Sequence, residues 1–341
     1  MATRHGSAQI TFPSDTEILI TRSFEAPRSL VWEVMTTPRH VLRWWGPSWH
    51  PIIECHIDLR PGGAWRYTSR DSDGNELSWH GVYRTVEPPV RLVTTEVFEL
   101  APQAEAVTTT TLDEHHGVTT VRTLVQHQNQ QHRDGHVSSG MEEGLQETYN
   151  RLDKLLSLAD TPAEKFRRVA GRFADRIAEV PADAWSNPSP CEGWTARDVV
   201  DHLLTWVPSV IGRSGIAFPH DLLASEDPAT AWEGFTTTLQ TALDDPEVSQ
   251  RAFDAGPPGT LTVEQAIDML VTSDVLVHTW DLARATGLDE RLDEHVAAQM
   301  LAGLEPMDEV LRASGHYGPR VIVADDADVQ TRLLAFTGRQ P

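Results

Sequence analysis

Apolar and polar positions alternate in short runs through the first half of the chain, and turn sequences separate these runs. Such alternation is typical of strands with one buried and one exposed face, and the turns RPGG, DSDGN, EPP and HHG are of the kind that join antiparallel neighbours. The pattern predicts a meander with strands at residues 9–24, 51–59, 63–70, 77–86, 91–100, 106–112 and 118–126.

Helical periodicity interrupts this alternation near its start and replaces it at its end. Two short runs, residues 29–37 and 38–46, read as helices, with Pro38 at the start of the second run and Gly46 at its end. A longer run, residues 140–158, places its large side chains on one helix face, namely Leu145, Tyr149, Leu152 and Leu156. We therefore expect a curved antiparallel sheet around one long C-terminal helix.

The second half follows the short polar segment ADTP and is dominated by helical periodicity. Helices are predicted at residues 163–180, 195–213, 228–245, 263–286 and 293–313, followed by an apolar strand at 321–323 and a last helical turn that ends near Gly338. The chain is thus predicted to be an α+β protein of two independently folding domains, residues 1–159 and 160–341. The second is an all-α bundle with a small α/β tail.

One predicted helix carries charge on its buried face. Thr262 and Gln265 have the spacing of a capping box, and Gly287 stands where a left-handed residue would end the helix. An unpaired carboxylate in a core costs several kcal/mol, so it must be paired, protonated or bound to a metal. The core-facing line between the two ends contains Ile267, Leu270, Val271, Asp274, His278 and Asp281.

A second predicted helix offers a partner to this charged face. Thr195 can cap it, and its inward line includes His202. Two imidazoles and a carboxylate can then converge into a three-ligand metal site with an open position, formed by His202, Asp274 and His278 with Asp281 beside them. The alternative is that each inward histidine is a core residue with an ordinary hydrogen-bond partner, and that Asp274 and His278 form a simple pair.

The composition limits which binding partners and which cellular compartment we expect. The 341 residues carry a net charge of −22 without a block of Lys or Arg, which argues against nucleic acid and anionic membranes as partners. The N-terminus lacks the apolar region of a signal peptide, and no apolar run is long enough to span a bilayer, so we expect a cytoplasmic protein. Cys55 and Cys191 fall in different predicted domains, which fits a reducing compartment.

Six of the eleven tryptophans lie in the first predicted domain. These rings would either pack the core and rim of the sheet or form a cage around a ligand. His50, His56 and His80 lack the spacing of metal ligands, and His80 is the one we expect first to face a cavity as a hydrogen-bond donor. The candidate cavity residues are Trp44, Trp45, Trp65, Trp79 and His80.

The first domain resembles a known superfamily in four segments, RWWGP at 43–47, DLRPGGAWRY at 58–67, HGVYRTVEPPVRLV at 80–93 and GMEEGLQETYNRLDKLL at 140–156. They are similar to the helix-grip, START-like superfamily, in the branch named for activators of the heat-shock-protein ATPase. The resemblance implies a cavity between sheet and long helix that holds an apolar or aromatic small molecule. It implies no particular chemistry, because this fold hosts carriers, cyclases and cochaperone-like modules.

The second domain resembles another family in PCEGWTARDVVDHL at 190–203, DVLVHTWDLARATG at 274–287 and RLLAFTGRQP at 332–341. These segments are similar to an actinobacterial metal-binding family of DinB-like four-helix bundles, relatives of the mycothiol-dependent maleylpyruvate isomerases. The resemblance implies metal ligands at His202, Asp274 and His278. The isomerases carry Glu at the position of Asp274, and their catalytic C-terminal part is not evident here. Cys191 reads as a fourth ligand, a nucleophile or a small buried residue.

The combined hypothesis is a metal-dependent enzyme. Zinc or a similar divalent ion would leave one position free for water or for a low-molecular-weight thiol such as mycothiol, and the activated thiol would transfer to, or isomerise, a hydrophobic or aromatic small molecule. Two alternatives remain, a non-catalytic small-molecule-binding or stress-response protein with a structural metal, and a helix-grip cyclase or hydrolase with the bundle as its oligomerisation unit. We expect a monomer or a homodimer.

Overall fold

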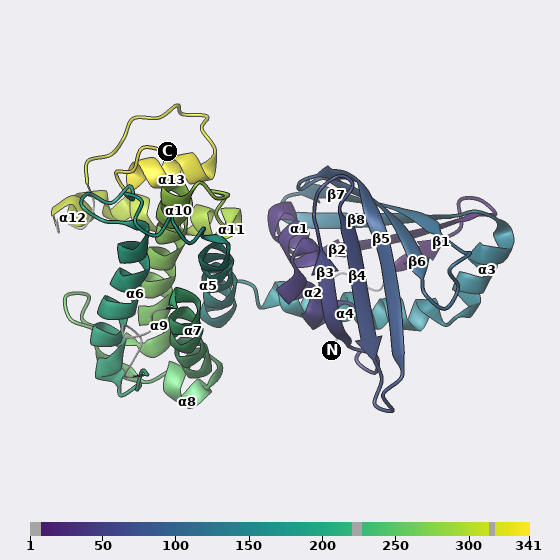
Figure 1. The fold of residues 1–341 in the computed structure, drawn as a ribbon, viewed down its shortest axis with the longest axis horizontal. Helices are drawn as coiled ribbons and strands as arrows, with labels where there is room; N and C mark the ends of the chain where they lie inside the picture. Colours follow the sequence, from purple (N-terminus) through teal and green to yellow (C-terminus); the bar gives the residue numbers. More distant parts are fainter. Residues whose placement is uncertain (1–7, 220–226, 314–317) are drawn as a thin grey trace. The chain divides into compact units, whose positions relative to one another are not determined.

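The computed structural model describes residues 8–219, 227–313 and 318–341. They form two compact units that divide between Ala159 and Asp160, and each unit is described by itself (Figure 1). In the described residues, no helix is long and apolar enough to cross a membrane.

The first unit contains an antiparallel sheet of eight strands in the order β1-β2-β8-β7-β6-β5-β4-β3. The predicted meander is confirmed, although the run at residues 9–24 is two strands, because Pro13 lacks a ladder donor and the chain turns after it. The strands are β1 (Gln9–Thr11), β2 (Glu17–Phe24), β3 (Ile52–Ile57), β4 (Ala64–Arg70), β5 (Glu76–Glu87), β6 (Arg91–Phe98), β7 (Ala106–His115) and β8 (Val118–His127).

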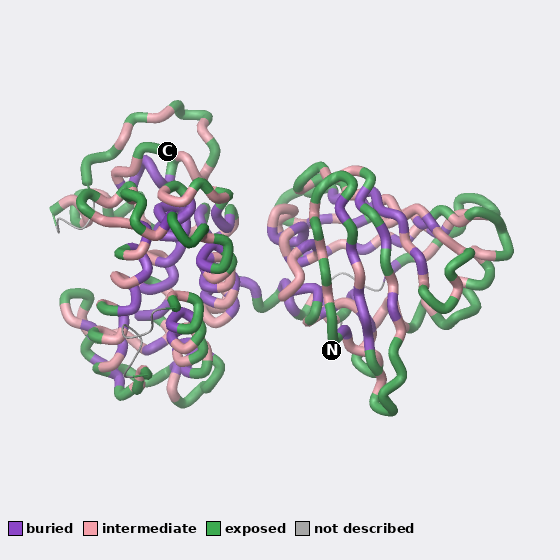
Figure 2. Tube along the Cα trace, viewed as in Figure 1, coloured by how far each residue is buried: buried purple, intermediate pink, exposed green. Residues whose placement is uncertain are grey.

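Four helices accompany the sheet, α1 (Arg28–Thr36), α2 (Pro38–Trp44), α3 (Gln130–Ser138) and α4 (Met141–Ser157). The long helix α4 packs on one face of the sheet, where Tyr149 and Leu152 join a core cluster with Ile18, Phe24 and Val121. Figure 2 shows the buried positions along this face. This arrangement confirms the predicted grip of a sheet on a C-terminal helix. The sequence missed α3, whose nine residues include none that is buried.

The second unit is helical. Its longer helices are α5 (Pro162–Glu179), α6 (Ala196–Ile211), α7 (Pro228–Asp244), α10 (Ser273–Thr286) and α11 (Glu294–Leu304), and its shorter elements are α8 (Pro246–Ser249), β9 (Ala252–Asp254), β10 (Thr260–Thr262), α9 (Val263–Ala266), α12 (Asp308–Ala313) and α13 (Val329–Phe336). Helices α5, α6, α7 and α10 contribute Phe173, Leu203, Phe235 and Val275 to one core cluster.

Two expectations for the end of the chain are corrected. The run predicted as one helix at 293–313 is interrupted by a 3₁₀ turn at Glu305–Met307, because Pro306 cannot donate an intrahelical hydrogen bond. Residues 321–323 form no strand, since the backbone N–H of Val321 donates to the carbonyl of Ala335 at the end of α13 instead of to a neighbouring strand.

Candidate metal centre in the helical bundle

The helix that carries the charged face begins and ends where the sequence predicts. Thr262 and Gln265 form a capping box at 3.0 and 3.3 Å, and Gly287 ends the helix with a left-handed φ of 72°. Within it, the segment Ile267–Thr272 is π-helical, and the hydroxyl of Thr272 donates to the carbonyl of Ile267 five residues earlier. A π-turn holds one more residue than an α-turn and therefore changes which side chains face the core just before Asp274.

His202 of α6 meets Asp274 and His278 of α10. Nε2 of His202 lies 3.3 Å from Oδ2 of Asp274, and Nε2 of His278 lies 3.4 Å from Oδ1 of the same carboxylate. The two imidazole rings are 5.2 Å apart at an angle of 71°. The donor atoms of the three residues all lie within 4.8 Å of one another. The structure therefore brings together the three residues that the sequence selected.

One side of this group is open. The side chain of His278 is 6% exposed, whereas those of His202 and Asp274 are both 32% exposed. Burial alone would raise the pKa of Asp274, but His278 and His202 hold this pKa well below its usual range. Burial alone would lower the pKa of His278, but the Asp274 carboxylate raises this pKa well above its usual value. Asp274 and His278 thus form an ion pair, and the exposed part of Asp274 faces an accessible space.

The second ring nitrogen of His278, Nδ1, contacts Asp281. Its Nδ1 lies 2.8 Å from Oδ2 of Asp281, a carboxylate with no exposed surface. Arg339, from the residues after α13, donates to both oxygens of Asp281 at 2.8 and 2.6 Å. A carboxylate on one imidazole nitrogen fixes the ring orientation and leaves the other nitrogen as the ligand atom. Asp281 therefore orients His278 and takes its charge compensation from Arg339.

Cys191 lies on the side of Asp281. Its Sγ is 3.5 Å from Oδ2 of Asp281 and 4.0 Å from Nη2 of Arg339. Cys191, His278 and Asp281 form a second group whose donor atoms lie within 4.8 Å of one another. Cys191 is half-buried, and it lies beside the Asp281 carboxylate that supports His278.

Two tryptophans border the open side. The indole N–H of Trp206 donates to Oδ2 of Asp274 at 2.9 Å. The ring of Trp194 lies 4.8 Å from that of His202 and is stacked 5.9 Å from that of His278. The sequence did not single out Trp206 as a contact of Asp274, although its position four residues after His202, on the same helix face, was the available signal.

The candidate cavity residues of the first unit fall into two groups. Trp44 and Trp65 are buried, and their indole N–H groups are bonded to the carbonyls of Val34 and Thr95. Trp45 and Trp79 are half-buried, with ring centroids 5.0 Å apart. Trp45 also lies 5.3 Å from Tyr67, and Trp79 stacks on Phe98 at 5.3 Å. These partly exposed rings form one aromatic cluster on the face of the sheet toward the helices.

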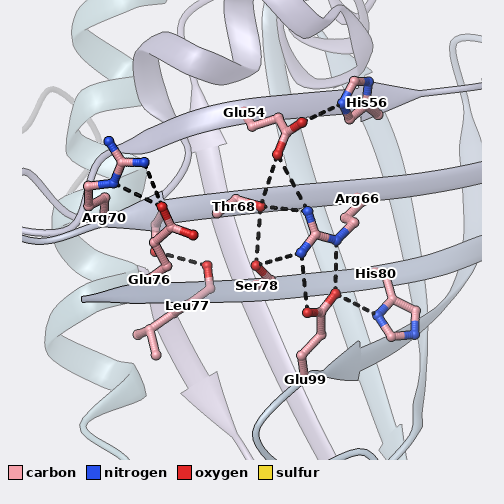
Figure 3. A network of polar contacts seen from close by, with 11 residues as sticks. Glu54, His56, Arg66, Thr68, Arg70, Glu76, Leu77, Ser78, His80 and Glu99 are labelled. Atoms are coloured by element: carbon pink, nitrogen blue, oxygen red, sulfur yellow. Dashed lines mark hydrogen bonds and ion pairs between the residues drawn. The ribbon is translucent and has the colours of Figure 1, made fainter. Parts of the chain in front are cut away.

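His80 does not face this cluster. It pairs with Arg66 across strands β5 and β4, whereas Trp79 pairs with Tyr67, and consecutive strand residues point to opposite faces. His80 lies in an exposed network on the outer face, with Nδ1 3.2 Å from Oε1 of Glu99 and Arg66 bonded to the same carboxylate (Figure 3). The prediction that His80 faces the cavity is wrong, because His80 directly follows Trp79 in β5 and therefore points to the opposite face of the sheet.

Glu96 provides a polar group on the inner face. It pairs with Ala106, which belongs to the core cluster beneath α4, so both side chains point toward the helices. Its side chain keeps some exposure, and burial raises its pKa to about 7. Nothing in the sequence singles out Glu96, because one carboxylate in an alternating strand is typical of an exposed position.

Comparisons with known proteins match each unit separately. Residues 25–157 match the family described as activator of Hsp90 ATPase homolog 1-like protein, and residues 166–283 match the mycothiol maleylpyruvate isomerase N-terminal domain. The uncharacterised protein Rv0738 of Mycobacterium tuberculosis is 30% identical over 199 residues, which cover 52% of this chain and 97% of that relative. The second match includes His202, Asp274 and His278, whereas Arg339 lies beyond it.

Solved structures resemble part of the chain. A protein from Rhodobacter sphaeroides with a crystal structure is 26% identical, with a TM-score of 0.42. The match covers 45% of this chain and 99% of the Rhodobacter chain. Protein Ms6760 from Mycobacterium smegmatis is 25% identical with a TM-score of 0.41, and it covers 44% of this chain and 96% of that one.

Proposed function

We propose that this chain is a metal-dependent transferase or isomerase. It joins a helix-grip domain of the activator of Hsp90 ATPase homolog 1-like family to a mycothiol maleylpyruvate isomerase N-terminal domain. The observation that carries the proposal is the convergence of His202, Asp274 and His278 beside an open side. The co-reactant is a low-molecular-weight thiol of the mycothiol kind.

The donor set fits a divalent transition metal. Two imidazoles and one carboxylate are the ligands of open zinc sites, and bonds of about 2.0–2.2 Å in tetrahedral geometry place neighbouring ligand atoms about 3.3–3.6 Å apart. The nitrogens of His202 and His278 lie 3.3 and 3.4 Å from different oxygens of Asp274, and the donor atoms of the three residues lie within 4.8 Å of one another. A small adjustment of these side chains would bring all three onto one ion. A bound zinc ion would supply charge that favours the deprotonated form of a thiol or water.

The protein groups around the site orient it. Asp281 and Arg339 fix the ring of His278, and the indole of Trp206 holds one oxygen of Asp274. Trp194 and Trp206 are half-buried and provide apolar walls that hold a hydrophobic substrate and limit the access of water. These contacts preorganise the ligand atoms before any ligand binds.

Thiol chemistry at this site follows one of two courses. The thiolate attacks an electrophilic carbon and displaces a leaving group, which gives transfer. In the other course, it adds to one end of an activated double bond, the resulting single bond rotates, and the thiolate leaves again, which gives cis–trans isomerisation. The hydrophobic or aromatic substrate class follows from the apolar walls that Trp194 and Trp206 provide at this site.

Metal content and thiol-dependent turnover test the proposal together. The purified chain should hold a divalent metal that the His202→Ala and His278→Ala variants lose, and it should consume an electrophilic aromatic or maleyl-type substrate only when a small thiol is added. A metal retained without thiol-dependent turnover would favour a structural role. Turnover that survives loss of both histidines would move the activity to the helix-grip domain.

A further inference from the structure

A second histidine cluster lies in the helix-grip domain, where β8 ends and α3 begins. His127 is the last residue of β8, and His132 and His136 follow it on α3. Histidines four residues apart lie on the same face of a helix. The side chain of Asn129 caps α3 by accepting from the backbone N–H of His132 at 2.9 Å, which fixes the start of the helix beside the strand end.

Two of these rings meet directly. Nε2 of His127 lies 3.2 Å from Nδ1 of His136, and the ring centroids are 5.2 Å apart at 83°. The distance suits a hydrogen bond, and it also suits two nitrogen ligands on one tetrahedral ion, for which the separation is about 3.3 Å. His127 pairs with Ala106 of the buried cluster, so its ring points toward the helices.

Two ring nitrogens of this cluster lack hydrogen-bond partners among the described residues, one of them on the side of the His127 ring that faces away from His136. Within the described chain, Nδ1 of His127 and Nδ1 of His132 are buried and have no hydrogen-bond partner. Neutral imidazoles present the lone pair that a metal needs. The nearby cation of Arg133 is occupied by Asp134 at 2.7 Å and by the ring of Phe12.

Helix α3 also lacks ordinary anchoring. None of its nine residues is buried, and a helix of this length is not stable in water without tertiary contacts. It nevertheless lies against β8 and α4 at one end of the sheet (Figure 1). The contact between His127 and His136 is one of the interactions that attach α3 to the end of β8.

We propose that His127 and His136 form a second metal site, in which a zinc-like divalent ion clamps α3 to the end of β8. Imidazole nitrogens suit Zn²⁺, Ni²⁺ and Cu²⁺. His132, four residues before His136 on α3, is the candidate third ligand. Its ring would have to adopt another rotamer to join, because among the described residues the ligand atoms of the three histidines do not lie within 4.8 Å of one another. Water completes the coordination. This site is independent of the centre in the bundle.

Zinc stoichiometry separates the two sites in the full chain. We expect about two ions per chain in the parent protein, one in His202→Ala/His278→Ala, and one in His127→Ala/His136→Ala. The matched control, His115→Ala/His116→Ala, removes two exposed histidines from the β7–β8 turn and should keep both ions. If the bundle variant binds no zinc, the second site is refuted while the bundle site stands. If the parent binds only one ion, and loses it in His127→Ala/His136→Ala, the second site stands and the proposed function loses its metal.

An NMR titration keeps His127 and His136 in place. Its result therefore does not depend on whether the His127→Ala/His136→Ala variant folds. In His202→Ala/His278→Ala, zinc should shift the imidazole NMR resonances of His127 and His136 and slow amide exchange across residues 130–138. The resonances of His115 and His116 should stay unchanged. Unchanged resonances of His127 and His136 at saturating zinc would overturn the proposal.

Discussion

The indole N–H of Trp206 donates to Oδ2 of Asp274 at 2.9 Å, and the same oxygen lies 3.3 Å from Nε2 of His202. Trp206 and His202 are four residues apart on α6, so one helix face provides both a ligand candidate and the group that restrains the neighbouring carboxylate. The indole and the imidazole therefore fix the position of the Asp274 carboxylate between α6 and α10.

Replacing Trp206 with Phe should therefore weaken the metal centre without unfolding the bundle. Loss of a hydrogen bond to a metal ligand reduces metal affinity by about 10- to 100-fold. Competition with a chromophoric chelator measures the zinc affinity, and the visible spectrum of the Co²⁺ form reports the coordination geometry. Trp194→Phe is the control, because Trp194 contacts the histidine rings but donates no hydrogen bond to Asp274 among the described contacts. Equal affinities of the parent and Trp206→Phe would show that the indole does not restrain Asp274.

Arg339→Ala should destabilise the bundle. Asp281 has no exposed surface, and its pKa stays below the usual value, against the effect of burial, through His278 and Arg339. Removal of the partner of a buried charge costs about 3 kcal/mol. Urea unfolding measures the loss, and Arg291→Ala is the control, because Arg291 is 76% exposed and its pair with Asp289 should contribute little. A change as small as that of Arg291→Ala would mean that Asp281 is sufficiently compensated by His278.

The sequence was sufficient to predict that His202, Asp274 and His278 lie together, because its evidence is local. A capping box, a left-handed glycine and helical spacing locate Asp274 and His278 on one face, and the same spacing locates His202. Arg339 could not be found in this way, since it is 58 residues from Asp281 and comes from the tail after α13. The π-helical segment was also missed, because no residue type at 267–272 distinguishes it from an α-turn.

The fold prediction failed where apolar periodicity is missing or misleading. Helix α3 has no buried residue, so its sequence carries no core-facing pattern. The apolar triplet at 321–323 suggested a strand, yet Ile322 is 97% exposed and no partner strand lies beside it in the described chain. His80 was assigned to a cavity from its residue type, although strand parity places it opposite Trp79.

Glu96→Gln should make the helix-grip domain more stable at neutral pH. The folded pKa of about 7 exceeds the unfolded value of about 4.3, so the folded state keeps its proton while the unfolded state loses it. The free energy of unfolding therefore falls as pH rises from about 4 to 7. At about 1.4 kcal/mol per pH unit between the two pKa values, the variant should exceed the parent by up to about 4 kcal/mol at pH 8 and should match it below pH 4. Urea unfolding at both pH values is the measurement, and a pH-independent difference would indicate that Glu96 titrates normally.

The two halves should fold separately when expressed as residues 1–159 and 160–341. Their buried clusters share no residue, since one ends at Ala159 and the other begins at Phe166. Asp160 belongs to the bundle, because its Oδ1 lies 2.6 Å from Nε2 of His295 and accepts from Gln299. Each fragment should give one cooperative thermal transition by circular dichroism. A cut after residue 165 is the contrasting boundary and should destabilise the second fragment.

An aromatic ligand should bind beside Trp45 and Trp79. These rings are partly exposed and lie 5.0 Å apart, and Trp79 stacks on Phe98, so a further planar ring can extend the cluster. Titration with naphthalene- and anthraquinone-type compounds should quench tryptophan emission, and Trp79→Leu should weaken binding about tenfold. Trp49→Leu is the control, because Trp49 is 53% exposed and is not part of the cluster. Equal binding by the parent and both variants would place the ligand elsewhere, and unchanged emission across the panel would leave the two histidine-based sites as the remaining candidates for function.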